Sequence, residues 1–260
     1  MMITPFGEEP LMLIEYATFL KPSNVKAYFS TRIGGVSKAP FESLNFGRAT
    51  SDEPGNIDEN YQRLYRAVKG RRRHLYANQV HGTEIYVDRG IESGSVGDFD
   101  AIISSYSDAF ITTYHADCYP VYFASARNGV FGLAHAGWKG VYGELVKKVY
   151  MKMKEICDKD LSDLMVVVGP GICVEHYEVG ESLAADFRDK FSTSVVLSKD
   201  GRYFLNLKEC IVHTLAEVGI SDEKIKVSGA CTYEKSDLFY SFRRDGADAG
   251  RMLAVITAGG

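Results

Sequence analysis

The fold expected for this chain follows from residues 120–134, PVYFASARNGVFGLA. Two apolar runs, Pro120–Ser125 and Val130–Ala134, flank Arg127-Asn128-Gly129. Asn-Gly between two strand-forming runs is typical of a β-hairpin with a type I′ turn, because both turn residues tolerate a positive φ. The stretch therefore predicts two adjacent antiparallel strands.

Residues with a high β propensity dominate the whole region from Leu75 to His135. Before the hairpin they predict strands at Leu75–Gln79, Glu84–Asp88, Ala101–Ser104 and Phe110–Tyr114. Nearer the N-terminus we expect strands at Leu11–Tyr16 and Lys26–Ser30, the second leading into a turn at Gly34-Gly35. A helix should follow, with Asn56 as its N-cap and with Tyr61, Leu64, Tyr65 and Val68 on one face.

Helices and strands alternate in the second half of the chain. A long helix is expected at Val141–Cys157, because Leu145, Val149, Met153 and Ile156 recur at helical spacing. A buried strand at Leu164–Val168 should end at Gly169-Pro170-Gly171. The remaining pattern predicts helices at Glu181–Lys190 and Leu207–Val218, and strands at Ser194–Leu197, Tyr203–Asn206, Lys226–Ser228 and Leu253–Thr257.

The composition is that of a globular chain. The 260 residues are 45% hydrophobic, which allows a large core, and no linker, repeat or low-complexity stretch divides them. We therefore expect one α/β domain over residues 1–260, with mixed β-sheets and helices packed outside them.

Charge and cysteine content exclude several classes of protein. The net charge is −4, and the single dense basic run, Gly70 to Arg73, is typical of a solvated helix end, so we expect no nucleic-acid partner. No apolar run approaches 18 residues and MMITPFGEEP lacks the pattern of a signal peptide, so no membrane partner is expected. Five cysteines without a CxxC motif indicate reduced thiols and a cytoplasmic location. The oligomeric state stays open.

Three side chains with affinity for metals lie at the ends of expected strands, beside glycines. They are His81, Cys118 and His135. Two imidazoles and a thiolate suit zinc, and three protein ligands leave one position for a reactant, as in catalytic zinc sites. Their spacing matches no local zinc motif, so only the fold can bring them together. The alternative is two hydrogen-bonded histidines at strand ends and a small buried cysteine.

A series of motifs resembles one known family. The motifs are Ser30-Thr-Arg-Ile-Gly-Gly-Val-Ser37, Leu44-Asn-Phe-Gly47, Asn78-Gln-Val-His-Gly82, Ala116-Asp-Cys-Tyr-Pro120, His135-Ala-Gly-Trp-Lys-Gly140, Gly169-Pro-Gly-Ile172, Tyr177-Glu-Val-Gly180, Cys231-Thr232, Phe239-Tyr-Ser-Phe-Arg-Arg244 and Gly250-Arg251. In order and spacing they resemble the YfiH family, also called the laccase-domain or polyphenol-oxidoreductase family. The resemblance extends from about Tyr28 to Ile256.

The resemblance implies a fold, a ligand set and an activity. The family fold is an α/β architecture grouped with cysteine-hydrolase-like toxins. The family's metal ligands map onto His81, Cys118 and His135. Its members look like purine nucleoside enzymes that phosphorolyse adenosine, inosine and methylthioadenosine and deaminate adenosine. Two other roles attributed to it are amide hydrolysis in the editing of peptidoglycan precursors and copper-dependent oxidation of phenols.

The sequence departs from the usual family pattern at three places. Lys139 stands where Arg is common, which keeps the charge but loses a bidentate fork. Cys173-Val-Glu-His-Tyr177 replaces a more usual Gly-Pro-Cys-Cys-Tyr, and His115 replaces a smaller residue. The expected ligands are unaffected, whereas the shape of the substrate pocket is open.

Deamination needs a carboxylate that moves a proton beside the metal. Asp117, next to a ligand, is the first candidate and Asp100 the second. Each has a structural alternative: Asp117 could orient a ligating histidine, and Asp100 could be a turn residue before a strand.

Phosphorolysis needs an anion site near the metal. Arg32 beside Gly34-Gly35 offers a guanidinium and backbone N–H groups, and Lys139 stands at the start of the long expected helix. Asn45 and Gln79, both within matching motifs, complete the expected substrate- and phosphate-binding set. A second basic cluster, Arg243, Arg244 and Arg251, could equally be structural.

The leading hypothesis is thus a zinc-dependent enzyme that takes a purine nucleoside and phosphate. The main alternative is an amidohydrolase that uses either zinc or Cys118 as a nucleophile with His135 as its base. A Cu²⁺ oxidase is less favoured, because the chain has six histidines and no His-x-His pair. A non-enzymatic binding module for a nucleotide or a muramyl peptide is a further alternative. Cys173 with His176 as a nucleophile–base pair, and His115 as a further ligand, are less favoured than structural roles.

Overall fold

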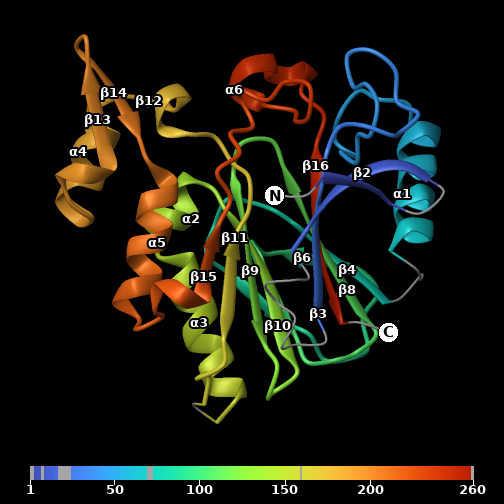
Figure 1. Cartoon of the computed structure of the whole chain (residues 1–260), viewed down its shortest axis with the longest axis horizontal. Coiled ribbons are helices and arrows are strands. Elements are labelled where there is room, and N and C mark those ends of the chain that lie inside the picture. The colour runs from blue at the N-terminus through green and yellow to red at the C-terminus, as the bar shows by residue number, and fades with distance from the viewer. Residues whose placement is uncertain (1–2, 7–8, 17–24, 69–72, 159, 259–260) are drawn as a thin grey trace.

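The computed structural model describes residues 3–6, 9–16, 25–68, 73–158 and 160–258, and it arranges them in four layers. Two β-sheets pack face to face in the middle (Figure 1). Helix α1 (Pro54–Ala67) covers the outer face of one sheet, and α3 (Leu145–Ile156) and α5 (Leu207–Glu217) cover the outer face of the other. The expected α/β class with mixed sheets and outer helices is confirmed.

The first sheet has seven strands in the order β1-β2-β3-β16-β8-β4-β6. Strand β4 pairs in parallel with β6 and β8, and the other neighbours are antiparallel. The strands are β1 (Ile3–Phe6), β2 (Glu9–Glu15), β3 (Val25–Ser30), β16 (Met252–Ala258), β8 (Ala109–His115), β4 (Arg73–Asn78) and β6 (Gly94–Asp98).

The second sheet has six strands in the order β15-β11-β9-β10-β7-β5. Its two outer pairs, β15 with β11 and β7 with β5, are parallel. The strands are β15 (Ile225–Val227), β11 (Met165–Val168), β9 (Tyr119–Ser125), β10 (Val130–Ala136), β7 (Ala101–Ser104) and β5 (Ile85–Val87).

The hairpin β9–β10 is buried along its whole length because both of its faces are covered. Val121 and Phe123 face the helices, whereas Tyr122 and Ala124 face the first sheet. Alternate side chains of a strand point to opposite faces, so a strand between two layers needs apolar residues at every position. This explains the unbroken apolar runs in residues 120–134.

A small third sheet, β12-β14-β13, lies beside α4 at one end of the molecule (Figure 1). The remaining elements are β12 (Glu178–Val179), β14 (Arg202–Leu205), β13 (Val196–Lys199), α4 (Glu181–Lys190), α2 (Trp138–Tyr142) and α6 (Phe242–Asp245). In the described part of the chain, no helix combines the length and apolar character needed to cross a membrane.

Three expected local features were wrong. Ser125 pairs with Val130, so the hairpin loop has four residues, and Gly129 (φ 61°) has a positive φ whereas Asn128 does not, which excludes a type I′ turn. Helix α1 begins at Pro54 after Glu53, not at Asn56, as suits a proline in the first turn.

The third is the long helix expected at Val141–Cys157, which is two helices, α2 and α3. They are separated at Gly143 and Glu144, and Glu144 is in the left-handed region (φ 58°), which no α-helix can contain.

The interpretation of the basic run from Gly70 to Arg73 as a solvated helix end was also wrong for Arg73, the one residue of the run that the structure describes. Gly70 to Arg72 lie outside the described residues, but Arg73 opens β4 and is not a solvated helix end. Its guanidinium is 2.8 Å from Asp88 and 3.0 Å from Asp108, and its side chain is 10% exposed. Arg73 is therefore a largely buried ion-pair partner.

Candidate active site

Strand ends from both central sheets meet at one end of the sandwich. The parallel strands β4 and β8 both end there, and the antiparallel β16 begins there with Met252 opposite His115. In the second sheet, β9 begins and β10 ends at the same place, with Tyr119 opposite Ala136. The chain crosses between the sheets here twice, after β4 and after β8, and these crossings carry His81 and Cys118.

His81, Cys118 and His135 converge at this junction. One ligand atom of each lies within 4.8 Å of the other two. The two imidazole rings are 4.9 Å apart between centroids and nearly perpendicular, so their edges can point at one centre. His135 is buried, Cys118 is half-buried and His81 is exposed, so the cluster is open on one side.

Asp100 holds two of these side chains in place. One carboxylate oxygen lies 2.9 Å from His135 Nδ1, and the carboxylate also accepts hydrogen bonds from the backbone N–H groups of Val80, His81 and Gly82 at 2.6–3.2 Å. Burial would raise the pKa of Asp100, but His135 and these amides hold it below its ordinary value. A carboxylate on Nδ1 orients the ring and leaves Nε2 of His135 free for a metal.

The backbone at the junction is strained. His81 has φ 58° and Asp117 has φ 100°, and residues other than glycine rarely adopt positive values. The amides around His81 are held there by Asp100. Such conformations persist only where surrounding contacts enforce them, and they are frequent at functional sites.

Gly137 is required by close approach to the cluster. A Cβ atom at this position would lie 2.9 Å from His81 Cδ2 and 3.0 Å from Cys118 Sγ. Contacts below about 3.0 Å force a neighbour to move, so any side chain here would displace the two groups. The glycine of the His-Ala-Gly-Trp motif thus leaves room for the cluster.

The electrostatics favour a thiolate at Cys118. Burial alone would raise the pKa of this thiol, but His135 and His81 beside it lower it below the ordinary value. Burial in turn would lower the pKa of His135, and Cys118 and Asp100 raise it. Both shifts describe one thiolate–imidazolium interaction, and the thiolate is the form that binds metal ions. The donor set, its proximity and its charge therefore fit a divalent ion.

His115 does not belong to this cluster. Its Nδ1 lies 2.9 Å from the carbonyl oxygen of Cys118, and its Nε2 lies 2.8 Å from Thr113 Oγ1. Since a carbonyl only accepts, Nδ1 carries the proton and Nε2 accepts from the threonine. Burial lowers the pKa of His115, which keeps the ring neutral. The expected structural role is consistent with these contacts.

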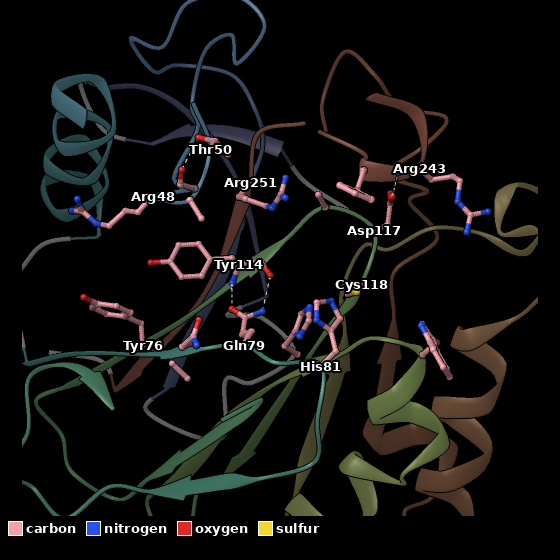
Figure 2. A pocket seen from close by; sticks show the side chains of 18 of the residues that line it. Arg48, Thr50, Tyr76, Gln79, His81, Tyr114, Asp117, Cys118, Arg243 and Arg251 are labelled. Carbon is pink, nitrogen blue, oxygen red and sulfur yellow. Dashed lines mark hydrogen bonds between the residues drawn. The ribbon is translucent and has the colours of Figure 1, made fainter. Parts of the chain in front are cut away.

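A cavity of about 730 Å³ opens over the cluster. It lies between the strand ends, the segment around Gly47 and the segment around α6, and Figure 2 shows Arg251 above His81, with Gln79 and Tyr114 on one side and Asp117 on the other. The lining residues are Gly47, Arg48, Ala49, Thr50, Tyr76, Ala77, Asn78, Gln79, His81, Ser95, Tyr114, Ala116, Asp117, Cys118, His135, Trp138, Tyr177, Phe242, Arg243 and Arg251.

Asp117 and Gln79, two of the expected site residues, lie in the cavity wall with their polar atoms engaged. Asp117 accepts a hydrogen bond from the backbone N–H of Arg243 at 2.7 Å (Figure 2). It accepts a second from Thr232 Oγ1, also at 2.7 Å. Gln79 exchanges two hydrogen bonds with the backbone of Tyr114, at 2.7 and 2.9 Å. Each carboxylate oxygen has a second lone pair, so Asp117 keeps capacity to accept a proton.

Asn45 is fully buried and does not line the cavity. Its amide donates to Thr50 and Asp52 and accepts from the backbone N–H groups of Gly47 and Arg251. It therefore holds two segments that do line the cavity.

Arg32 and Lys139 also lie outside the cavity lining. Arg32 donates to the carbonyls of Glu42 and Ser236, and the N–H groups of Gly34 and Gly35 donate to Ser43 Oγ. The expected anion cradle is thus occupied by a hydroxyl. Lys139 is exposed, and its ammonium lies 5.6 Å from the centre of the Trp138 ring.

Several lining residues were not among the expected site residues. They are an aromatic set and three cations, of which Arg243 and Arg251 belong to the basic cluster whose role was left open: Tyr76, Tyr114, Trp138, Tyr177, Phe242, Arg48, Arg243 and Arg251. Trp138, Tyr177, Phe242, Arg243 and Arg251 all belong to the motifs quoted above, which is the signal that could have found them. Burial lowers the pKa of Arg251, whereas Asp117 and Cys118 act in the opposite direction.

Cys173 and His176 are near each other but do not form a nucleophile–base pair. Burial, Cys231 and Glu175 raise the pKa of Cys173, which keeps this thiol protonated. Both residues instead approach Glu234: Cys173 Sγ lies 3.7 Å and His176 Nε2 lies 3.3 Å from its Oε1.

Several known proteins are similar to this chain. A family model described as multi-copper polyphenol oxidoreductase laccase matches residues 26–259. A purine nucleoside phosphorylase of Deinococcus radiodurans is 38% identical over 230 residues, which cover 88% of this chain and 87% of the relative. The purine nucleoside phosphorylase YlmD of Bacillus subtilis is 30% identical over 259 residues, or 95% and 93% of the two chains.

Two solved structures have the same fold. YlmD from Geobacillus stearothermophilus matches with a TM-score of 0.89 and 28% identity, over 98% of each chain. The Bacillus licheniformis protein YfiH matches with a TM-score of 0.87 and 28% identity, over 98% of this chain and 99% of that one.

Proposed function

Because the chain belongs to the YfiH family, matched by the multi-copper polyphenol oxidoreductase laccase model, we propose that it is a zinc-dependent purine nucleoside enzyme. The proposed reactions are phosphorolysis of adenosine, inosine and methylthioadenosine, and deamination of adenosine. The observation that carries the proposal is the convergence of His81, Cys118 and His135 at the floor of the cavity. Relatives named purine nucleoside phosphorylase support it.

In the proposed site, Nε2 of His135, Sγ of Cys118 and an imidazole nitrogen of His81 would hold the ion. A zinc ion in this position would supply Lewis acidity to the reactants in the cavity. Asp100 is a positioning residue, because it touches His135 and the His81 backbone and does not line the cavity. Its hydrogen bond keeps the Nδ1 proton of His135 in place and directs the ring.

The cavity suits a nucleoside. Its volume of about 730 Å³ is within the range of small-molecule sites, roughly 300–1,000 Å³. Aromatic side chains in the wall, among them Tyr114, Trp138 and Phe242, offer faces on which a purine can stack. For phosphorolysis, we assign the base to this wall and the ribose to the space over the metal ligands.

Phosphate needs a cation in the cavity, and Arg251 is the best placed. It lines the cavity, and its Nη1 donates to the carbonyls of Ala249 and Gly250, which leaves the other guanidinium N–H groups for an anion. Arg48 and Thr50 line the cavity as well. In phosphorolysis a phosphate oxygen attacks C1′ of the ribose, the glycosidic C–N bond breaks and the purine leaves with a proton.

Asp117 is the proposed proton carrier in deamination. Water adds to C6 of adenine, and ammonia leaves from the same carbon. Asp117, in the wall beside Cys118, takes a proton from the water and returns it to the departing amine. Thr232 and the N–H of Arg243 hold its carboxylate in one orientation.

The test is incubation of purified, metal-analysed protein with adenosine or inosine, with and without phosphate. We expect free base and ribose 1-phosphate only when phosphate is present, inosine from adenosine without it, and loss of both activities on chelation with recovery on adding zinc. No turnover of any nucleoside by the zinc-loaded protein would contradict the proposal.

One observation favours a second candidate function, amide hydrolysis. The lowered pKa of Cys118 and the raised pKa of His135 also describe a cysteine nucleophile beside an imidazolium. A thiolate nucleophile acts without a metal, so this candidate predicts amidase activity that survives a chelator. The family model's description also names copper, so the metal analysis should include it.

A further inference from the structure

A second group of metal-binding side chains lies outside the cavity lining. Cys173, His176 and Glu234 each offer a ligand atom, and these atoms lie within 4.8 Å of one another. Cys173 precedes a 3-10 turn at Val174–His176 and His176 is its last residue, whereas Glu234 comes from the segment that follows Cys231. Among the residues that the structure describes, this is the second such group, and none of its members is a ligand in the proposed active site.

Two of the three separations between ligand atoms suit a tetrahedral ion. At bond lengths of about 2.0–2.3 Å, two tetrahedral ligands lie about 3.4 Å apart for nitrogen and oxygen and about 3.6 Å apart for sulfur and oxygen. The observed separations are 3.3 Å from His176 Nε2 to Glu234 Oε1 and 3.7 Å from Cys173 Sγ to the same oxygen. The first is longer than most N–H···O hydrogen bonds.

The ligand orientations are constrained before any ion binds. The ring of His176 stacks on Tyr233, with centroids 4.3 Å apart and planes 17° apart, which fixes its plane. The backbone N–H of Cys173 lies 3.2 Å from Cys231 Sγ, and Gly171 forms a β-bridge with Cys231. The two segments that carry the ligands are therefore already joined.

From this geometry we propose that Cys173, His176 and Glu234 form a second binding site for a borderline-soft divalent cation of the zinc class. Thiolate, imidazole and carboxylate are the ligands that zinc accepts, and half-buried Cys173 and His176 with exposed Glu234 leave a fourth position for water. Binding would release the thiol proton of Cys173 to solvent.

An ion at this site would tie together two segments that support the cavity wall. The N–H of Ile172 donates to the carbonyl of Asp117, and Thr232 Oγ1 donates to its carboxylate. Tyr177, next to His176, lines the cavity. The second ion thus has a structural role that is separate from the proposed reaction.

The test uses Co²⁺ as the probe in Cys118→Ser protein, in which the proposed active site has lost its sulfur ligand. Thiolate bound to Co²⁺ gives a characteristic charge-transfer absorption, so a saturable band with one equivalent of Co²⁺ is expected from Cys173. The band should disappear in the Cys118→Ser, Cys173→Ser double variant. Loss of a residue that only hydrogen-bonds to a metal ligand weakens metal affinity roughly 10–100-fold. Because Glu234 is a proposed ligand itself, Glu234→Gln should weaken Co²⁺ binding at least as much.

Asp237→Asn is the matched control, because Asp237 is an exposed carboxylate three residues after Glu234 and is not one of the three ligands. It should leave the band and the affinity unchanged. A missing band in folded Cys118→Ser protein, or a band that persists in the double variant, would overturn the second site. Neither result depends on turnover of a nucleoside, so the proposed function is tested separately.

Discussion

Asp100 shows how much of the proposed site depends on a residue that no substrate touches. Its carboxylate binds His135 Nδ1 and three backbone amides around His81, so one side chain positions two of the three ligands. The sequence placed it second to Asp117 as a proton carrier, because a residue before a strand gives no sign of what lies beside it in the next sheet.

We predict that Asp100→Asn weakens zinc binding about 10- to 100-fold, since the amide cannot reproduce the charge that orients His135. Competition with a chelating dye measures the affinity. Asp98→Asn is the control: Asp98 is an exposed carboxylate nearby that accepts from Asn78. Equal affinities for the two variants would show that Asp100 does not position a ligand.

Gly137→Ala tests the close approach over the cluster. The added methyl would lie 2.9 Å from His81 and 3.0 Å from Cys118 Sγ, so we predict faster loss of zinc with the fold retained. Gly180→Ala has nothing within 4 Å of the added atom and should keep its zinc. Zinc release to a chelator, followed over time, compares them, and unchanged release from Gly137→Ala would contradict the proposed geometry.

Arg251→Gln tests the phosphate assignment. Loss of a charge-assisted hydrogen bond worth about 1.5–3 kcal/mol should raise the KM for phosphate roughly 10- to 100-fold, while the zinc content stays the same. Arg202→Gln, at an exposed ion pair on the small sheet, is the control. A KM for phosphate equal to that of the unmodified protein would exclude Arg251 from the anion site.

At the scale of the elements, most strands and helices could be predicted, because the apolar pattern alone determines them. Ala101–Ser104 and Glu181–Lys190 match the structure at both ends. Strand β6 was missed because Gly94 and Gly97 have positive φ and carry no β-forming signal. The break between α2 and α3 was missed because Glu144 in the left-handed region has no local signature.

The buried ion pair of Arg73 with Asp88 holds elements together away from the proposed site. Asp88 follows β5, Arg73 opens β4, and Ser104 at the end of β7 donates to Asp88 at 2.6 Å. Burial would raise the pKa of Asp88, but Arg73, Ser104 and the N–H of Gly90 lower it. The pair therefore stabilises the folded state while Asp88 is ionised.

Asp88→Asn should lower the free energy of unfolding by about 3 kcal/mol, because it leaves Arg73 without its buried partner. Since the folded pKa of Asp88 is depressed, its contribution is present above the unfolded value of about 3.9 and is lost as the pH falls through the lower folded value. Urea unfolding between pH 3 and pH 7 measures both effects. Asp108→Asn removes the exposed partner and should cost less than about 1 kcal/mol; a similar loss for both variants would contradict the account.

At the scale of the whole molecule, the sequence named the three candidate ligands by their positions at strand ends, but only the family motifs joined them into one site. His81, Cys118 and His135 meet because two sheets share one end and the chain crosses between them twice, which no local spacing encodes. The same reason explains the wrong expectation that Arg32 binds phosphate. Arg32 belongs to a family motif, but its guanidinium donates to the carbonyls of Glu42 and Ser236 and does not line the cavity. The direction of a side chain at the end of a strand depends on contacts with the neighbouring sheet, and the sequence around that residue does not specify these contacts.

The central claim is that three side chains from both sheets hold one ion at the floor of the cavity, and an anomalous difference map from crystals of the zinc-loaded protein tests it most directly. We predict a zinc peak at bonding distance, about 2.0–2.3 Å, from Nε2 of His135, Sγ of Cys118 and a ring nitrogen of His81. An empty cluster in zinc-saturated crystals, with both imidazoles hydrogen-bonded elsewhere, would contradict it.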